Sequence, residues 1–367
     1  MTVTIEAPME REINLANQMV TIQPTARVER LRQKYLNTRD RIVLDIIRSK
    51  TRVMKETLGQ PMATRQAKAF AAAVSEMTIN IYPDELFVGW LFCEPRGSNL
   101  PWGQALAIEG ELDTIASRKV NSFQLSDEDK VELREEIIPY WKEHRDGGST
   151  LPHWTAGYEK VLKIGLIGIK NQAEERISRL DLTDPDDFKK QAFLQGVVTA
   201  LDAALEIGGK FADKARELAD AETNPVRKSE LQKIAKTCDQ VPAHPARTFY
   251  EAIQSIWFIH ILHAIDNDHA SGMGPGRADQ YLYPFYKRDI EEGRMTKDEA
   301  QEMIDCWFMR YSQYFVVWSE YAGSYGTHTP HTPGHHLDIG GLRPDGRDAT
   351  NELSYMFIEA MMHTPGM

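Results

Sequence analysis

The most informative stretch of this sequence is CDQVPAHPARTFYEAIQ, residues Cys238–Gln254. Apolar residues recur at helical spacing before and after it, while Pro242 and Pro245 interrupt its centre. Proline cannot continue a helix, because it lacks an N–H group and its ring clashes with the preceding turn. The stretch therefore predicts a connection between a helix over about 226–238 and a long helix over about 246–266.

Helical periodicity extends in both directions from this connection. The sequence predicts further helices over 26–58, 64–77, from 126 onward, from 184 to about 208, over 209–221, 279–292, 297–312 and 350–362. Capping residues support several of these helices: Ser126, Asp184 followed by Pro185, and a capping box from Thr296 to Glu299. Two extended segments are expected, a buried one at Leu86–Trp90 and a short strand at Leu337–Leu342.

Composition limits the class of protein. The 367 residues are 42% hydrophobic and 26% charged, as in a soluble globular protein, and the net charge of -11 disfavours nucleic acid as a partner. No stretch of eighteen apolar residues predicts a transmembrane helix, and the N-terminus lacks the features of a signal peptide. Three distant cysteines favour a reduced, cytoplasmic setting. Residues 1–25 show no periodicity and are expected to form a flexible arm.

A histidine-rich loop is the first candidate for chemistry. His328, His331, His335 and His336 lie within HTPHTPGHH, and three converging imidazoles can hold zinc. Prolines and a glycine interrupt the run, whereas regular zinc sites place their ligands on a helix or strand. We therefore favour a loop whose histidines face solvent, bond to backbone or line a pocket, and keep metal binding as an alternative.

The other candidates favour structural roles. His260 and His263 share a face of an apolar helix and are expected to be neutral core histidines. Glycines 272, 274 and 276 do not match a nucleotide-binding motif and are expected to permit close backbone contacts. Glu109 and Glu111 are two residues apart, so they do not face each other on a helix. No nucleophile with an adjacent base is evident.

Four segments in order resemble the glycyl radical enzyme family, the pyruvate formate-lyase-like superfamily. They are RQAKA at 65–69 with PDELFVG at 83–89, HWTAGYEKVLKIGLIGI at 153–169, the opening stretch at 238–254, and GRADQYLYPFY at 276–286. Gly340-Gly341 and GRDATNELS at 346–354 also fit. The resemblance covers nearly the whole chain from Arg27 onward, and the opening stretch is its most specific part.

The resemblance implies a helix-rich α/β fold, the N-terminal half of a ten-stranded barrel, with residues 26–367 as one pyruvate formate-lyase-like domain. It implies cytoplasmic, anaerobic chemistry in which a glycyl radical generates a thiyl radical on a cysteine, and the thiyl radical attacks a small organic acid or alcohol. A radical S-adenosylmethionine activating enzyme installs the glycyl radical. A dry interior would shield both radicals.

This sequence departs from the family pattern in its cysteines. The family's thiyl cysteine and radical glycine belong to segments beyond the region that ends at Met367, and none of Cys93, Cys238 and Cys306 matches the thiyl position. The chain is therefore expected to be truncated before both segments and inactive alone, with no catalytic residue and no bound cofactor or metal of its own. A C-terminal half or a second copy in a homodimer is a possible partner, and poor solubility is expected.

The resemblance gives three candidate substrate-binding residues, His153, His269 and Ser271. Many dehydratases and carbon–nitrogen lyases of the family carry Gly-His-Ser before the Gly-Arg-x-Asp-Gln-Tyr motif, and this chain has HASGMGP at 269–275 with different spacing. Carbon–carbon, carbon–oxygen and carbon–nitrogen chemistry stay open, as do lyase and formate acetyltransferase-like activities. A non-catalytic helical binding remnant is the alternative from another class.

Overall fold

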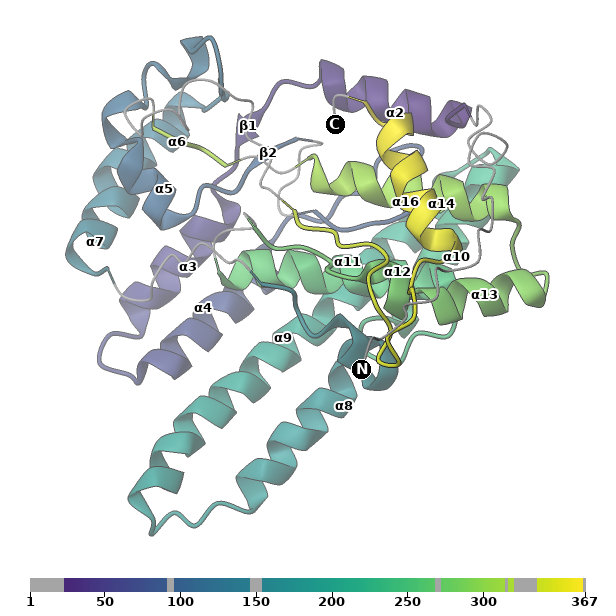
Figure 1. The fold of residues 1–367 in the computed structure, drawn as a ribbon. Coiled ribbons are helices and arrows are strands. Elements are labelled where there is room, and N and C mark those ends of the chain that lie inside the picture. The colour runs from purple at the N-terminus through teal and green to yellow at the C-terminus, as the bar shows by residue number, and fades with distance from the viewer. Residues whose placement is uncertain are drawn as a thin grey trace, which may run out of the picture.

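A computed structural model describes residues 23–90, 96–145, 154–267, 272–313, 316–319 and 335–365. Helices dominate these residues, and their only sheet is a pair of two-residue parallel strands, β1 (Arg41–Ile42) and β2 (Gly97–Ser98). The expected helix-rich architecture is confirmed (Figure 1). The helices are α2 (Ala26–Asn37), α3 (Asp45–Glu56), α4 (Met62–Glu76), α5 (Trp102–Ala107), α6 (Asp127–Glu132), α7 (Ile138–Glu143), α8 (Tyr158–Ser178), α9 (Pro185–Ala221), α10 (Pro225–Gln240), α11 (Phe249–Asp266), α12 (Ala278–Tyr281), α13 (Tyr283–Glu291), α14 (Lys297–Tyr311) and α16 (Glu352–His363).

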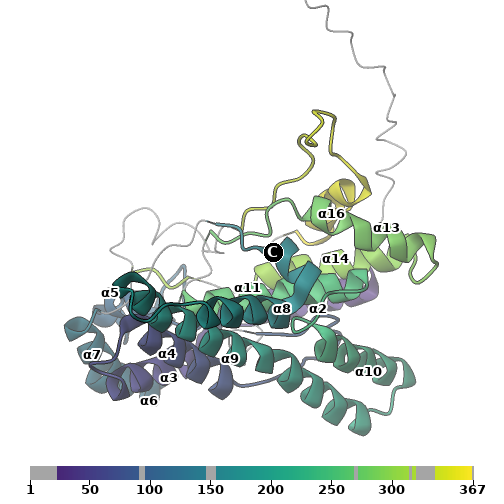
Figure 2. The same cartoon turned by 90° about the horizontal axis from the view of Figure 1, so that it is seen from below.

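Helix α11 forms the centre of the main core. Of its eighteen residues sixteen are buried, which is the pattern of a helix that is apolar on all sides. Helices α3, α4 and α9 lie on one side of it, and α16 with the loop before it lies on the other (Figure 2). The sequence predicted a long helix here from its apolar run and from the prolines that precede it, and this helix is confirmed.

The stretch Cys238–Gln254 joins four helices. Its turn lies beside a kink in α8 at Gly165, whose φ of 66° is left-handed. There the backbone N–H groups of Leu166 and Ile167 donate to the carbonyls of Pro242 (2.9 Å) and Ala243 (3.1 Å). A side chain at Gly165 or at Gly208 of α9 would overlap the backbone of this stretch. The stretch therefore determines how α8, α9, α10 and α11 pack.

Helices α8 and α9 form a long antiparallel hairpin that projects from the body of the molecule (Figure 1). Asp184 caps α9 as expected, accepting from two backbone N–H groups. The expected helix end near Gly208 is wrong, because α9 continues unbroken for 37 residues. Gly208 does not break the helix there. Its missing side chain instead lets α9 approach the carbonyl of Cys238 closely.

By length and composition α9 is also apolar enough to cross a membrane. Its most apolar window has a mean hydropathy of 1.2 and is 28% buried. One such helix in the described part of the chain is weak evidence for a membrane span, and α9 packs along α4, α8 and α10. The prediction that the chain has no transmembrane helix stays a prediction.

The predicted single helix over 26–58 is wrong. The chain forms α2 and α3, separated by β1, whose residues pair with Gly97 and Ser98. Val28, Leu31 and Tyr35 of α2 pack around α11. Helix α3 contributes to two cores, because Ile46 packs around α11 whereas Ile47 and Val53 pack with α5 and α7. Helical spacing on both sides of the break concealed it from the sequence pattern.

The segment Leu86–Trp90 is buried as expected, but it is not a strand, because the chain bends at Leu86 and Phe87 and Gly89 has a φ of 120°. Side chains of α11 take the place of a neighbouring strand. The amide of Gln254 accepts from Val88 N (2.9 Å) and donates to Val88 O (2.7 Å), and Trp257 Nε1 donates to Gly89 O (3.0 Å). These bonds satisfy buried backbone groups that would otherwise cost free energy.

The helix starts at Ser126 and Thr296 are confirmed, the latter with a complete capping box. At Leu337–Leu342 the structure has only isolated bridges, from Gly276 to Leu337 and from Leu342 to Asp348, so this segment is not a regular strand. Most of the expected arm at 1–25 lies outside the described residues. The ten-stranded barrel stays a proposal.

Candidate functional site

Histidine and aromatic side chains from four separate segments meet on one side of α11. Tyr158 opens α8, His260 comes from α11, Tyr311 ends α14, and His335 follows the segment 320–334, which lies outside the described residues. Stacking and edge contacts add Trp257 to this group. We call these five residues the histidine–aromatic cluster.

The cluster is closely packed. The rings of His260 and Tyr311 have centroids 4.9 Å apart, and His335 lies 5.0 Å from His260 and 4.8 Å from Tyr311. Tyr158 Oη and His260 Nδ1 are 3.4 Å apart, and His335 Nδ1 lies 2.7 Å from the carbonyl of Met273. These contacts hold both imidazole rings in fixed orientations.

Burial removes charge from the cluster. His260 is 2% exposed, and desolvation lowers its pKa well below the usual range, with further lowering by His335 and His263. Burial lowers the pKa of His335 to about 4, although its bond to the Met273 carbonyl opposes this. Burial also raises the pKa of Tyr158 and Tyr311. All four side chains are therefore uncharged near pH 7, as the sequence predicted for His260.

The motif at 276–286 holds the segment that carries His335. Arg277 Nη2 donates to the carbonyl of Gly340 (2.6 Å), and Asp279 Oδ2 accepts from the N–H of Gly340 (2.7 Å). Gln280 Nε2 donates to the carbonyl of Ala349 (2.9 Å). Sequence reasoning gave the motif no role in the site. The polar residues Arg277, Asp279 and Gln280, which follow three closely spaced glycines, were the feature of the sequence that could have indicated this role.

The three predicted substrate-binding residues, His153, His269 and Ser271, lie outside the described residues and stay predictions. Two residues at the cluster are close to them in the sequence. Tyr158 is five positions after His153, and Met273, which bonds to His335, is two positions after Ser271. The cluster residues Tyr311, Trp257 and His335 were not expected to meet.

The metal alternative gains no support. His328 and His331 lie outside the described residues, and the described part of the chain contains no group of three His, Cys, Asp or Glu residues that could hold a metal. His335 bonds to a backbone carbonyl, while the side chain of His336 is exposed. The tight approach of Gly274 to the backbone of His336 confirms the expected close backbone contact for this glycine.

The cysteines and the paired glutamates have structural surroundings. Cys238 and Cys306 are buried free thiols whose pKa burial raises, and Cys93 lies outside the described residues. Glu111 is buried and pairs with Arg118, while Glu109 pairs with Lys142 at 2.6 Å on the surface. The expectation that the two carboxylates do not act together is therefore supported.

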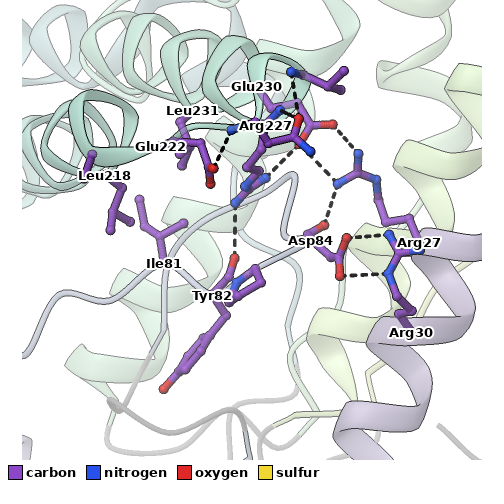
Figure 3. A pocket seen from close by; sticks show the side chains of 14 residues that line it. Arg27, Arg30, Ile81, Tyr82, Asp84, Leu218, Glu222, Arg227, Glu230 and Leu231 are labelled. Carbon is purple, nitrogen blue, oxygen red and sulfur yellow. Dashed lines mark hydrogen bonds and ion pairs between the residues drawn. The ribbon is translucent and has the colours of Figure 1, made fainter.

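A second hollow, of about 690 Å³, lies where α2, the segment 81–84 and the start of α10 meet (Figure 3). Three arginines line it, and each is engaged. Arg30 Nη2 contacts Asp84 Oδ1 at 2.6 Å, Arg27 donates to the carbonyl of Asp84 at 2.9 Å, and Arg227 contacts Glu230 Oε2 at 2.9 Å. We call this the arginine hollow.

The arginine hollow is not an anion site. The lining contains three guanidinium groups and three carboxylates, those of Asp84, Glu222 and Glu230, so an entering phosphate would meet no net positive charge. Arg227 also donates to the carbonyls of Tyr82 (3.2 Å) and Glu85 (2.9 Å). The bonds tie α2 and α10 to the segment that leads into Leu86–Trp90, which is a structural task.

Comparison with known proteins gives a consistent family. The family model described as "Pyruvate formate lyase-like" matches residues 19–147 and 147–367. Isethionate sulfite-lyase of Oleidesulfovibrio alaskensis is 34% identical, over 88% of this chain and 43% of that protein. Trans-4-hydroxy-L-proline dehydratase of Clostridioides difficile is 30% identical, over 91% of this chain and 46% of that protein.

Solved structures agree. The structure for 1,2-propanediol dehydration in Roseburia inulinivorans superimposes with a TM-score of 0.85 at 31% identity, over 93% of this chain and 46% of that one. A glycyl radical enzyme from Archaeoglobus fulgidus gives a TM-score of 0.82 at 30% identity. The 367 residues thus span somewhat less than half the length of the relatives they match.

Proposed function

We propose a function from the premise that this chain belongs to the pyruvate formate lyase-like family, whose matched members are glycyl radical enzymes. The proposal is that it forms the N-terminal portion of a radical lyase or dehydratase, which removes a small group such as water or sulfite from a small polar organic substrate. Acyl transfer of the formate acetyltransferase kind is less well supported, because the relatives above are a sulfite-lyase and dehydratases.

The observation that carries the proposal is the uncharged histidine–aromatic cluster, whose Tyr158 follows His153 by five positions in the sequence and whose His335 bonds to Met273, two positions after Ser271. Radical intermediates require a site from which water is excluded. Two neutral imidazoles and three large rings, closely packed and mostly buried, supply such a wall. In the proposal, His153, His269 and Ser271 hydrogen-bond the substrate's polar groups, and the cluster keeps their side chains oriented.

The radical-bearing residues are proposed to come from a part of the protein beyond these 367 residues. Two facts support this. The relatives are more than twice as long as the matched region, and Cys238 and Cys306 are buried as protonated thiols inside the helical core. When present, the glycyl radical would supply a thiyl radical for hydrogen-atom abstraction. The residues of this chain would bind and orient the substrate and exclude water.

Two partners follow from the proposal. Glycyl radical enzymes are activated by radical S-adenosylmethionine enzymes, so we propose such an activating enzyme as one partner. The other is the remaining half of the barrel, in the same polypeptide or in a separate one. The proposed setting is the cytoplasm of a cell living without oxygen, because a protein radical is sensitive to oxygen.

The test starts from the coding region that continues beyond, or lies beside, the codon for Met367. The complete protein is activated without oxygen, its radical is followed by electron paramagnetic resonance, and release of sulfite or loss of water is measured on a panel of small hydroxylated substrates. Changing His153→Gln or Ser271→Ala should lower kcat/KM about 100-fold or more while leaving the radical signal intact.

His144→Gln is the matched control, because His144 stacks on Tyr140 in the other core and should leave turnover unchanged. A radical signal without elimination of any leaving group would contradict the lyase or dehydratase assignment. The absence of any radical in the complete activated protein would contradict the family chemistry itself. Equal activity of the His153 variant and the control would remove His153 from the site.

A further inference from the structure

A groove of about 360 Å³ lies between α8, α9 and α11. Its walls are apolar, with Phe70 from α4, Ile169 from α8 and Leu262 from α11 among them. Three polar residues, Lys160, His263 and Asp266, lie along it near the first turn of α8 and the last turn of α11. Pockets of this size and composition hold small molecules.

Within the described residues, neither Lys160 nor Asp266 takes part in an ion pair, and both side chains are exposed, whereas Lys170 farther along α8 pairs with Asp202 at 2.5 Å. The backbone carbonyl of Asp266 accepts from Lys50 Nζ at 3.1 Å, which holds the end of α11 in place. Burial lowers the pKa of His263, although the charge of Asp266 opposes this, so the groove also holds a neutral imidazole.

We propose that this groove is a binding site for a small zwitterion with an apolar body, of the class of apolar α-amino acids. Asp266 meets the ligand's ammonium group, Lys160 meets its carboxylate, and its apolar side chain lies against Phe70, Ile169 and Leu262. A molecule of about ten heavy atoms fits the volume. The opposite charges at one place distinguish this ligand from a fatty acid or an amine, each of which would satisfy only one of them.

The groove shares α8 and α11 with the cluster. His263 lines the groove one turn along α11 from His260, on the same face, and contributes to lowering the pKa of His260. Occupancy of the groove would therefore contact both elements that support the cluster. Binding itself needs no radical, so failure of the proposed function leaves this inference standing, and the reverse also holds.

Isothermal titration of the unactivated 367-residue chain tests the ligand class. L-leucine should bind. 4-Methylpentanoate, which lacks the ammonium group, and 3-methylbutylamine, which lacks the carboxylate, should each bind at least tenfold more weakly, and glycine should give no heat. Equal affinity of either single-charge analogue and leucine, or no heat from leucine at millimolar concentration, would overturn the proposal.

Variants locate the site. Ala200→Phe places a ring in the groove from α9 and should weaken leucine binding at least tenfold, while Ala192→Phe, outside the groove on the same helix, should not. Asp266→Asn should weaken leucine about tenfold and leave the binding of 4-methylpentanoate, which has no ammonium group, unchanged. The exposed pair member Asp186→Asn is its control. Circular dichroism confirms that each variant is folded, and unchanged binding by folded Ala200→Phe would exclude this groove.

Discussion

The histidine–aromatic cluster and the arginine hollow both gather titratable side chains at helix ends. The two regions differ in the charge of these side chains. In the cluster His260 is 2% exposed and uncharged near neutral pH. In the hollow Arg30 keeps 57% of its side chain exposed and pairs with Asp84, whose pKa the hydrogen bond from Arg30 lowers. Burial keeps an imidazole neutral, whereas a guanidinium group stays charged and therefore needs carboxylate partners.

This difference in charge suits the cluster to a functional role and the hollow to a structural one. A neutral, closely packed wall suits a site that must exclude water, and it can hold a small substrate without paying for buried ions. A balanced set of ion pairs near solvent fixes the register of α2 and α10 and leaves little charge for a ligand. Three tests of this contrast are ordered from the largest expected change in stability to the smallest.

The largest effect is expected from placing an acid in the cluster. His260→Asp must either bury a charge without a partner or hold an unfavourable proton, and should lower the free energy of unfolding by about 3–5 kcal/mol in urea denaturation. Asn224→Asp is the matched change at the arginine hollow. There Asn224 caps α10, a task that aspartate performs as well, so the loss should stay within about 0.5 kcal/mol. Similar losses for both variants would refute the contrast.

The pH dependence should differ between the two regions. His335 has a folded pKa of about 4, below the unfolded value near 6.5, so the unfolded chain takes up the proton first and stability falls as pH drops from about 6.5 to 4. Asp84 has a lowered pKa, so its contribution is present above about pH 4 and is lost only below that value.

Unfolding free energies of the natural chain and of His335→Asn at pH 7, 5.5 and 4.5 measure this difference. The variant should lose about 1–2 kcal/mol less than the natural chain across the interval. Asp84→Asn should leave the slope in this interval unchanged. Parallel curves for His335→Asn and the natural chain would show that His335 takes up its proton at the same pH in both states.

The smallest effect is expected from Arg30→Met. The pair with Asp84 has a short contact of 2.6 Å but lies at the surface, so its removal should cost less than about 1 kcal/mol at low salt and almost nothing in 1 M NaCl. Arg179→Met, which breaks an exposed pair with Glu175 on α8, is the control. A salt-independent loss above 2 kcal/mol would show that the hollow is as dry as the cluster.

The sequence alone determined the helical composition, most helix starts and the family. Ser126, Asp184 and Thr296 act through bonds to backbone groups two or three residues away, so their effect is local and can be predicted from the sequence. The break after Asn37 and the continuity of α9 through Gly208 could not be predicted in this way. Both depend on partners far along the chain, β2 in the first case and the Cys238 carbonyl in the second.

The tertiary structure alone decided which side chains meet and which lose their charge. Sequence patterns predicted that His260 would be buried, because its neighbours on the helix are apolar. They could not bring His335, Tyr311 and Tyr158 to its side, because these residues are 51 to 102 positions away from His260 and meet it only by packing around α11. Periodicity reports the face of one helix, whereas desolvation and ring contacts depend on every element that covers that face.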